Sequence, residues 1–383
     1  MKFLAIICEL NPFHNGHKYL IEKAKETANC DAVLCIMSGN FTQRGDMCIA
    51  DKYTRAKHAI CGGADLVIQL PAPFAVAPAE IFARGAIKIL SAIPEVTTLA
   101  FGCESGNKQD FINSAKLLIE ESDKFRSVLC EKLSFGESYI KSYAAAFEAC
   151  GGAKGLLNKP NNVLALEYTK AILRTNANIN ILPVKRIGAD YNDGELKENF
   201  SSASAIRKNL KSETVRNNLP DFVYGDIKNF TACSEFDGFL RNKLYLTNAD
   251  DLKKVYGGGE GLENKLKSLE NEPLETIIEK ATSKRYSSSR IKRMLCANAL
   301  ELYQNDCEKY LKSDLYIKPL AVKKQRADEL LSALAKSTYP TVTGIDAEKL
   351  NPIAKECFEK DAKEFALYNF LTHSDKKDYM IIV

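Results

Sequence analysis

The first twenty residues of the chain place a glycine-containing turn between an apolar run and a helix. Residues 3–8 are apolar and β-compatible, the run stops at Glu9, and a helix is predicted just beyond Gly16. Backbone N–H groups converge at such a junction, and the helix dipole makes the N-terminus positive. The stretch therefore predicts a phosphate site that His14 and His17 face together. A turn with ordinary surface or capping histidines is the alternative.

Alternating strand and helix patterns continue through about the first two hundred residues. Continuous apolar runs, which suit strands buried on both faces of a parallel sheet, alternate with amphipathic stretches. The predicted strands cover residues 32–37, 65–70, 96–101 and 179–184, and the predicted helices cover residues 17–28, 51–61, 78–91 and 108–155. Repeated βαβ units of this kind predict an α/β fold with a parallel sheet and helices on both faces.

The second half of the chain has a mainly helical pattern. With 383 residues the chain exceeds the usual size of one hydrophobic core, so two domains are expected. We place the α/β domain at residues 1–210 and a mainly helical α+β domain at residues 211–383. Short β-like runs at residues 315–317 and 379–383 predict a small α/β closure of the second domain.

Composition excludes several classes of protein. The chain is 45% hydrophobic and 27% charged, and its net charge of +4 is too small to indicate nucleic-acid binding by itself. The 12 cysteines are scattered without Cys-X-X-Cys pairs, so no zinc site and no other protein-held metal is expected. We expect reduced thiols, a cytoplasmic location and no membrane or signal segment.

The loops that follow the predicted strands are expected to share one binding site. In open parallel sheets, ligands bind outside the carboxyl ends of the strands. This rule brings both histidines together with the loop of residues 38–46 and with Gly102, and it places Arg186 at the end of a later strand. Asn162 lies at a predicted helix start, where capping is its simplest role.

A second anion-binding pattern lies at residues 200–208, with the sequence Phe-Ser-Ser-Ala-Ser-Ala-Ile-Arg-Lys. Ser201 and Ser202 offer hydroxyl and backbone N–H groups at a predicted helix start, and Arg207 adds a cation one turn later. For this run taken alone, a serine cap on a solvated helix is the alternative.

A basic stretch opens a predicted helix in the second half. It contains Lys284, Arg285, Arg290, Lys292 and Arg293 within ten residues. Cations at the N-terminal end of a helix that buries an apolar stripe are suited to RNA phosphates. A solvated charged face is the alternative.

Both anion-binding patterns resemble signatures of one superfamily. The tetrapeptide at residues 14–17 resembles the His-X-Gly-His signature of the adenylyl-transferring nucleotidyltransferases, and residues 200–208 resemble their second signature. This resemblance implies a Rossmann-like domain that binds ATP with both histidines near the phosphates.

A closer resemblance, to the bacterial tRNA(Met) cytidine acetate ligase family, covers most of the chain. It rests on short runs at residues 11–17, 38–45, 65–71, 79–83, 101–102, 161–162 and 185–188. That family uses ATP and acetate to acetylate N4 of the wobble cytidine of elongator tRNA(Met), and its second half binds tRNA. The resemblance implies ATP and Mg²⁺ as cofactors, acetate as a substrate and elongator tRNA(Met) as the partner.

The resemblance also implies site residues. His14, His17 and Arg207 are assigned as catalytic groups that neutralise charge on the phosphates, because no serine or cysteine nucleophile lies beside a base in the motif. The implied ATP contacts are Ile7, Cys8, Glu9, Leu10, Asn11, Pro12, Phe13, His14, Asn15, Gly16, His17, Lys18, Tyr19, Leu20, Gly102, Asn162, Arg186 and Ile187, with Ser201 and Ser202 from the second signature.

Three hypotheses follow from these patterns. The first is an acetate ligase that acts on tRNA through an acetyl-adenylate. The second is a small-molecule adenylyltransferase acting on a phosphorylated cofactor precursor, which would leave residues 211–383 without a role. The third is a non-catalytic nucleotide- or RNA-binding protein, which the presence of both histidines and both signature serines disfavours.

Overall fold

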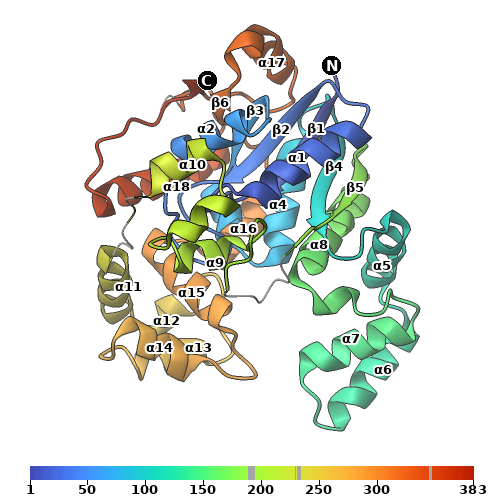
Figure 1. Cartoon of the computed structure of the whole chain (residues 1–383). Coiled ribbons are helices and arrows are strands. Elements are labelled where there is room, and N and C mark those ends of the chain that lie inside the picture. Colours follow the sequence, from blue (N-terminus) through green and yellow to red (C-terminus); the bar gives the residue numbers. More distant parts are fainter. Residues whose placement is uncertain (189–194, 229, 231–233, 345–346) are drawn as a thin grey trace.

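The computed structural model describes residues 1–188, 195–228, 230, 234–344 and 347–383. These residues form a seven-stranded sheet with helices on both faces (Figure 1). The strand order is β5-β4-β1-β2-β3-β6-β7. The strands are β1 (Phe3–Cys8), β2 (Ala32–Ser38), β3 (Leu66–Leu70), β4 (Val96–Cys103), β5 (Asn180–Lys185), β6 (Pro319–Val322) and β7 (Ile381–Ile382).

Strands β1 to β5 run parallel, which confirms the predicted parallel sheet. β1 lies between β2 and β4, and Ala5 is paired with Leu34 on one side and Leu99 on the other. β2 pairs with β3, and β4 pairs with β5, also in parallel. The chain order therefore reverses between β1 and β4, and open sheets of this kind bind ligands at that point.

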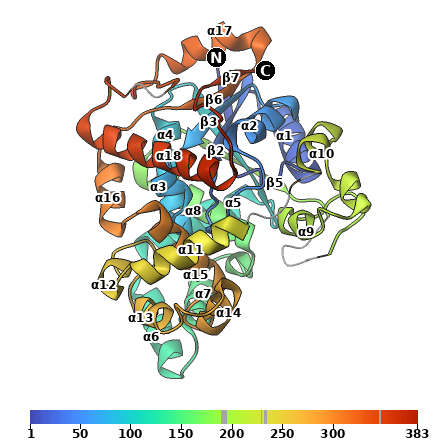
Figure 2. The same ribbon diagram turned by 90° about the vertical axis from the view of Figure 1, so that its left-hand side faces the viewer.

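Alternate residues of the central strands are buried against helices on opposite faces. Phe3, Leu34 and Ile68 belong to the core that includes helices α4 and α8, whereas Leu4 and Val67 belong to the core that includes α1 and α2. Figure 2 shows α1, α2 and α10 on one side of the sheet and α3, α4 and α16 on the other. Burial on both faces explains why the strands have continuous apolar sequences.

The helices before residue 210 follow the predicted alternation. The predicted helix at residues 17–28 begins two residues earlier, because His14 is its N-cap. The helical stretch at residues 108–155 is divided into three helices. The helices are α1 (Asn15–Thr27), α2 (Lys52–Cys61), α3 (Ala72–Ala75), α4 (Ala79–Ser91), α5 (Lys108–Glu120), α6 (Asp123–Ser134), α7 (Tyr139–Ala149), the 3₁₀ helix η1 (Leu156–Asn158), α8 (Pro160–Thr175) and α9 (Ala203–Lys208).

The chain beyond residue 210 is mainly helical, as predicted. Buried residues of α11 to α15 belong to the same contiguous core as those of α4 and α8. The division at residue 210 therefore remains a prediction. The helices are η2 (Glu213–Asn218), α10 (Asp221–Ile227), α11 (Ser234–Leu246), α12 (Ala249–Leu252), α13 (Leu262–Lys267), α14 (Leu274–Ala281), α15 (Ser288–Leu300), α16 (Gln304–Lys312), η3 (Lys324–Arg326), α17 (Ala327–Leu334) and α18 (Pro352–Leu371).

The predicted closure of a second domain by two short β-like runs was wrong. The run at residues 315–317 forms only an isolated bridge from Ile317 to Thr341, the strand β6 follows it, and β7 lies within the predicted run at residues 379–383. β6 pairs antiparallel with β3, and β7 pairs in parallel with β6, so both extend the first sheet. The physical reason is that β3 would otherwise be an edge strand with unpaired backbone groups, which β6 satisfies. Short β-like runs carry no sequence signal for which sheet they join.

A buried ionic cluster fixes the C-terminal tail to the sheet. The carboxylate of Asp378 lies 2.7 Å from Lys52 Nζ and 2.5 Å from Lys318 Nζ, and it accepts a 2.5 Å hydrogen bond from the Tyr53 hydroxyl. Both lysine side chains are almost completely buried. Burial alone would raise the pKa of Asp378, but the two ammonium groups lower it to about 2. A buried carboxylate of this kind compensates two charges that lie out of reach of water.

Replacing Asp378 by alanine is expected to lower the free energy of unfolding by about 3–5 kcal/mol, because two buried ammonium groups lose their counterion. Equilibrium urea denaturation at pH 7 measures this loss. Asp375→Ala is the matched control, since Asp375 is exposed three residues away. The Asp378 contribution is present above its unfolded pKa of about 4 and is lost as the pH falls toward 2. An equal effect of both substitutions would contradict the buried pairing.

Candidate active site

A cleft of about 680 Å³ opens at the carboxyl ends of β1, β2, β4 and β5. It lies at the predicted edge of the sheet, next to the point where the strand order reverses. Its lining comes from segments far apart in the sequence. The lining residues are Ile7, Cys8, Glu9, Leu10, Asn11, His14, His17, Leu20, Thr42, Gln43, Arg44, Asp46, Ala79, Phe82, Phe101, Gly102, Ile140, Leu157, Asn158, Pro160, Asn161, Val163, Leu164, Tyr168, Arg186, Ser202, Ala203, Ser204, Arg207 and Ser289.

His14 and His17 lie together in the lining, as the sequence predicts. Their ring centroids are 3.8 Å apart. The Gly16 N–H donates to His14 Nδ1 at 3.0 Å, and the His14 N–H donates to His17 Nδ1 at 3.3 Å. Because both Nδ1 atoms accept hydrogen bonds, each neutral ring carries its proton on Nε2. The reciprocal capping bonds therefore fix the tautomer of both rings and leave each with an Nε2–H donor.

The glycine between the histidines is required by the closeness of the His14 ring. A Cβ atom at Gly16 would lie 2.9 Å from His14 Cε1 and 3.0 Å from His14 Nδ1. Any larger residue would push the ring off the start of α1 and weaken its cap. The sequence predicts the glycine for a phosphate-binding turn, and the structure adds this steric reason.

Both histidines are held in the neutral state. Burial, followed by the positive charge of Arg186, lowers the pKa of His17 to about 3. Burial also lowers the pKa of His14 well below its usual range, and the nearby His17, Arg186 and Arg207 charges act in the same direction. At neutral pH the two rings are hydrogen-bond donors and not cations. The positive charge of the cleft comes from its arginines.

The second signature is brought against the first. Arg207, on α9, donates from Nη1 to the backbone oxygen of Asn11 at 2.6 Å, and its Nη2 lies 3.7 Å from Asp46 Oδ2. Ser202 caps α9 by accepting from the Ala205 N–H at 3.1 Å, and it lines the cleft. The predicted cap and the predicted proximity to the site therefore both occur at Ser202.

The β4 and β5 ends supply Gly102 and Arg186. Gly102 lies within β4, one residue beyond the predicted end of that strand, and a Cβ atom there would lie 3.4 Å from Arg186 Cγ. The Arg186 N–H donates to the Cys103 oxygen at 2.9 Å. Burial lowers the pKa of Arg186, although the carboxylate of Glu104 opposes this effect.

Asn162 does not cap α8, so that interpretation was wrong. The helix begins at Pro160, and Lys159 is the N-cap. The Asn162 side chain instead accepts from the Glu104 N–H at 2.9 Å and from the Ser105 N–H at 3.4 Å. Asn162 thus holds the loop after β4, and its neighbour Asn161 lines the cleft.

The loop of residues 38–46 forms one wall of the cleft. The Gln43 N–H donates to Glu9 Oε1 at 2.6 Å. Burial raises the pKa of Glu9, although this hydrogen bond and the nearby arginine charges oppose the shift. Gly45 has a φ of +79°, and a Cβ atom there would lie 2.5 Å from the Lys292 oxygen. Only glycine permits this approach between the loop and α15.

Much of the basic stretch at residues 284–293 is engaged within the protein. Arg290 donates to Glu260 at 2.8 Å, Lys292 Nζ lies 3.1 Å from Asp46 Oδ1, and Arg293 Nη1 donates to the Gln43 oxygen at 3.0 Å. Burial, followed by neighbouring arginine charges, lowers the pKa of Arg293 to about 10. Lys292 and Arg293 hold α15 against the cleft wall, whereas Arg290 holds it to the segment of residues 257–260. Lys284 and Arg285 are exposed.

The implied ATP contacts divide into residues that line the cleft and residues that support it. Phe13 is completely buried in the core, and Asn15 Nδ2 donates to the Asn217 oxygen at 2.8 Å, so each supports the fold around the site. Ser201 Oγ accepts from the Lys197 N–H at 2.7 Å. The implied residues that do not line the cleft are Pro12, Phe13, Asn15, Gly16, Lys18, Tyr19, Asn162, Ile187 and Ser201.

Several lining residues were not singled out from the sequence. Tyr168 and Leu164 on α8, Ile140 on α7 and Ser289 on α15 reach the cleft only through tertiary packing. Helical apolar periodicity describes Leu164 and Tyr168 as ordinary core residues, so it gives no signal for the site. Residues 189–194, which follow Arg186 and the predicted motif at 185–188, lie outside the described residues.

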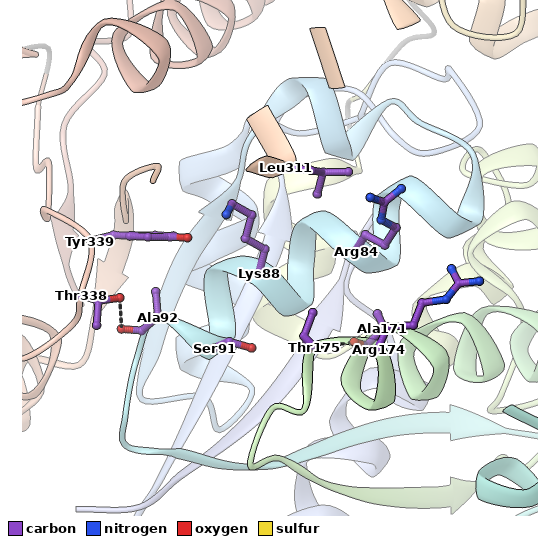
Figure 3. A pocket seen from close by; sticks show the side chains of 10 residues that line it. All are labelled: Arg84, Lys88, Ser91, Ala92, Ala171, Arg174, Thr175, Leu311, Thr338 and Tyr339. Carbon is purple, nitrogen blue, oxygen red and sulfur yellow. Dashed lines mark hydrogen bonds between the residues drawn. The ribbon is translucent and has the colours of Figure 1, made fainter. Parts of the chain in front are cut away.

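A second cavity of about 560 Å³ lies away from the cleft, near the amino ends of β4 and β5 (Figure 3). It is bordered by the C-terminal ends of α4 and α8, which precede the amino ends of β4 and β5. Arg84 and Arg174 in its lining are paired with Glu308 and Glu80, at 2.7 Å and 2.9 Å. None of the sequence motifs reaches this cavity.

Two further expectations concern metals and membranes. Within the described ranges, no group of three or more histidine, cysteine or acidic side chains is arranged to hold a metal ion. The cysteines among the described residues are free thiols. None of the helices in that part of the chain is long and apolar enough to cross a membrane.

Comparisons with known proteins agree with this site. The family model described as HIGH Nucleotidyl Transferase matches residues 1–380. The chain is 33% identical to a tRNA(Met) cytidine acetate ligase of Clostridium perfringens, covering 100% of this chain and 98% of that protein. It is 36% identical to a protein of the same name from Clostridium botulinum, covering 92% and 93%.

Solved structures resemble the chain over its full length. Apo TmcAL of Thermotoga maritima has 29% sequence identity and a TM-score of 0.91, with 100% of both chains covered. The structure of the same protein bound with alpha-thio ATP has 28% identity and a TM-score of 0.89, again with complete coverage.

The fold and the paired histidine and arginine site therefore define a HIGH nucleotidyltransferase. Within this class, the named relatives match the chain over nearly its whole length. The chain belongs to the tRNA(Met) cytidine acetate ligase family. The family predicted from the sequence motifs is confirmed.

The imidazole signals of His14 and His17 are expected to show no titration between pH 5 and pH 8, because burial and the arginine charges keep both rings neutral. Both pKa values lie below the unfolded value of about 6.5. As the pH falls below about 6.5, the unfolded chain binds protons at these histidines first, so the free energy of unfolding decreases. NMR of imidazole-labelled protein measures this, with exposed His373 as the reference signal. Titration of either active-site ring near pH 6.5 would contradict the assignment.

Proposed function

We propose that this chain is an ATP-dependent ligase that acetylates N4 of the wobble cytidine of elongator tRNA(Met), with acetate as the acetyl source. The observation that carries the proposal is the convergence of His14, His17, Arg186 and Arg207 on one cleft. Four donor side chains around a helix N-terminus suit a polyphosphate. The names of the relatives support the acetate and tRNA parts of the proposal.

ATP is the proposed nucleotide. The Nε2–H groups of His14 and His17 would donate to phosphate oxygens, and Arg186 and Arg207 would add positive charge. The similarity of the chain to Thermotoga maritima TmcAL bound with alpha-thio ATP supports this choice. The remaining implied contacts, including Pro12, Lys18, Tyr19 and Ile187, lie outside the cleft lining, and their contact with ATP remains a proposal.

Mg²⁺ is proposed to reach the cleft bound to the phosphate oxygens of ATP. Asp46 is already paired with Lys292 and Arg207, and Glu9 accepts from the Gln43 N–H. Among the described residues no group of three or more potential metal ligands is present, which fits an ion held mainly by phosphate oxygens. Such an ion would neutralise negative charge on the phosphates.

The proposed reaction has two steps. An acetate oxygen attacks the α-phosphorus of ATP, the bond to the β-phosphate breaks, and pyrophosphate leaves with the formation of acetyl-adenylate. The cytidine N4 then attacks the acetyl carbonyl carbon, AMP leaves, and N4 loses one proton. The first step joins two anions, so donors that neutralise charge in its transition state would supply most of the acceleration.

The second half of the chain is the proposed tRNA-binding region. Exposed Lys284 and Arg285 are the members of the basic stretch best suited to RNA phosphates. Lys292 and Arg293 would act indirectly by holding α15 beside the cleft, and Arg290 by fixing α15 to Gly257 and Glu260. A small-molecule adenylyltransferase would use the same two signatures and is the alternative that the experiment must exclude.

The direct test incubates the purified chain with ATP, Mg²⁺, labelled acetate and elongator tRNA(Met), followed by nucleoside analysis. We expect label in N4-acetylcytidine, dependent on both ATP and tRNA. A tRNA whose wobble cytidine is replaced by uridine is the matched control and should remain unlabelled. ATP turnover without label in RNA would reject the ligase and favour the adenylyltransferase.

His14→Ala and His17→Ala are each expected to lower kcat by about 30- to 1000-fold, equivalent to about 2–4 kcal/mol, while ATP affinity changes much less. The reason is that donors aimed at the transferring phosphate act mainly in the transition state. Steady-state kinetics with a separate ATP-binding measurement distinguishes the two effects. His373→Ala, on an exposed residue, should leave both unchanged. An effect confined to KM would contradict the catalytic role.

A further inference from the structure

Four apolar side chains are exposed at the tip of the hairpin formed by α6 and α7. Leu133 is 38% exposed, Phe135 72%, Tyr139 60% and Ile140 74%. We call these four residues the hairpin patch. Neighbouring large apolar side chains with this exposure mark an interaction site more often than isolated ones do.

The hairpin patch is continuous with the cleft. Ile140 belongs both to the patch and to the cleft lining, and the lining also includes Ser289 at the start of α15. The cleft therefore extends from the tip of the hairpin to the basic stretch. Figure 1 shows α6 and α7 on one side below the sheet and α13 to α15 on the other.

The aromatic groups of the patch are supported from below by the hairpin core. The Tyr139 ring stacks on the Tyr143 ring with centroids 5.7 Å apart, and the Tyr143 ring packs edge-on against Phe125 at 5.1 Å. Phe125 is completely buried. Tyr139 is therefore positioned by packing and yet remains more than half exposed, which is the arrangement of a preformed binding surface.

We propose that the hairpin patch binds unstacked nucleobases of the single-stranded RNA loop that presents the acceptor base to the cleft. This inference rests on the proposed function. A base whose amino group must reach the cleft has to leave its stack in the loop, and aromatic side chains replace the lost stacking. Stacking surfaces of this kind tolerate different bases, because every base has a flat π-face.

The charges around the cleft mouth complement such a loop. Lys141 is exposed beside Ile140, and Lys284 and Arg285 are exposed in the stretch that leads to Ser289. An RNA loop between the hairpin and α15 would place its bases on the apolar side and its phosphates near these cations. The patch thus differs from the arginine-lined floor of the cleft, which suits the nucleotide phosphates.

The test measures binding of the anticodon stem-loop of elongator tRNA(Met) to the full-length chain by fluorescence anisotropy. Phe135→Ala and Tyr139→Ala are each expected to weaken binding by about tenfold, within the range known for base–aromatic stacking. Tyr139→Phe should bind like the wild type, because it keeps the ring. Phe370→Ala is the matched control, since Phe370 on α18 is also 72% exposed.

Further readouts separate stacking from loss of structure. A 2-aminopurine placed beside the wobble position should be quenched on binding to the wild type and remain bright with Tyr139→Ala. ATP binding should be unchanged in both alanine variants. Unchanged stem-loop affinity in correctly folded Phe135→Ala and Tyr139→Ala would overturn the proposal.

The outcomes also separate this inference from the proposed function. If the wild type acetylates tRNA while the patch variants bind and react normally, the function stands and the patch assignment fails. If no acetylation occurs but stem-loop binding still depends on Phe135 and Tyr139, the ligase assignment fails and RNA binding by the patch stands. If sedimentation shows that these variants only dissociate a dimer, the patch contacts a second copy of the chain, and the proposal is overturned.

Discussion

The cleft depends on one buried cation, Arg55. Its side chain is completely buried on α2. It donates to the backbone oxygens of Glu9 after β1, of Ser38 at the end of β2, of Gly39 after β2, and of Ala50. Buried carbonyl groups at the ends of strands need donors, and one guanidinium satisfies several of them at once. The backbones that leave the two central strands are thereby fixed relative to each other, and the histidines and the loop of residues 38–46 are fixed with them.

Hydrogen bonds between ionisable side chains and backbone groups also connect distant parts of the site. Arg207 joins the second signature to the first through the Asn11 oxygen, and Arg293 joins α15 to the Gln43 oxygen. Glu364 on α18 accepts from the Asn40 N–H. Each contact couples an ionisable side chain to a backbone group of a cleft loop. The helical second half is therefore part of the framework of the active site, in addition to its proposed role toward tRNA.

Electrostatics divides the cleft into zones with different chemistry. Burial, followed by the arginine charges, lowers the pKa of both histidines and keeps them neutral, so the nucleotide would meet fixed cations together with neutral Nε2–H donors. At the mouth, Ile140 of the hairpin patch and Ser289, which follows the basic residues Lys284 and Arg285, both line the cleft, and we propose that RNA binds there. This division would let the two proposed substrates, a small anion with its nucleotide and a large RNA, bind to different parts of one cleft.

The sequence by itself determined the α/β class, the parallel strands β1 to β5, the histidine pair and the family, because continuous apolar runs and short glycine-containing motifs are local signals. Only the tertiary structure decided that β6 and β7 join the first sheet and that Asn162 binds the loop after β4. It also decided that Arg290, Lys292 and Arg293 are engaged within the protein. These features depend on which backbone groups and charges remain unsatisfied after packing, and no local pattern in the sequence records that.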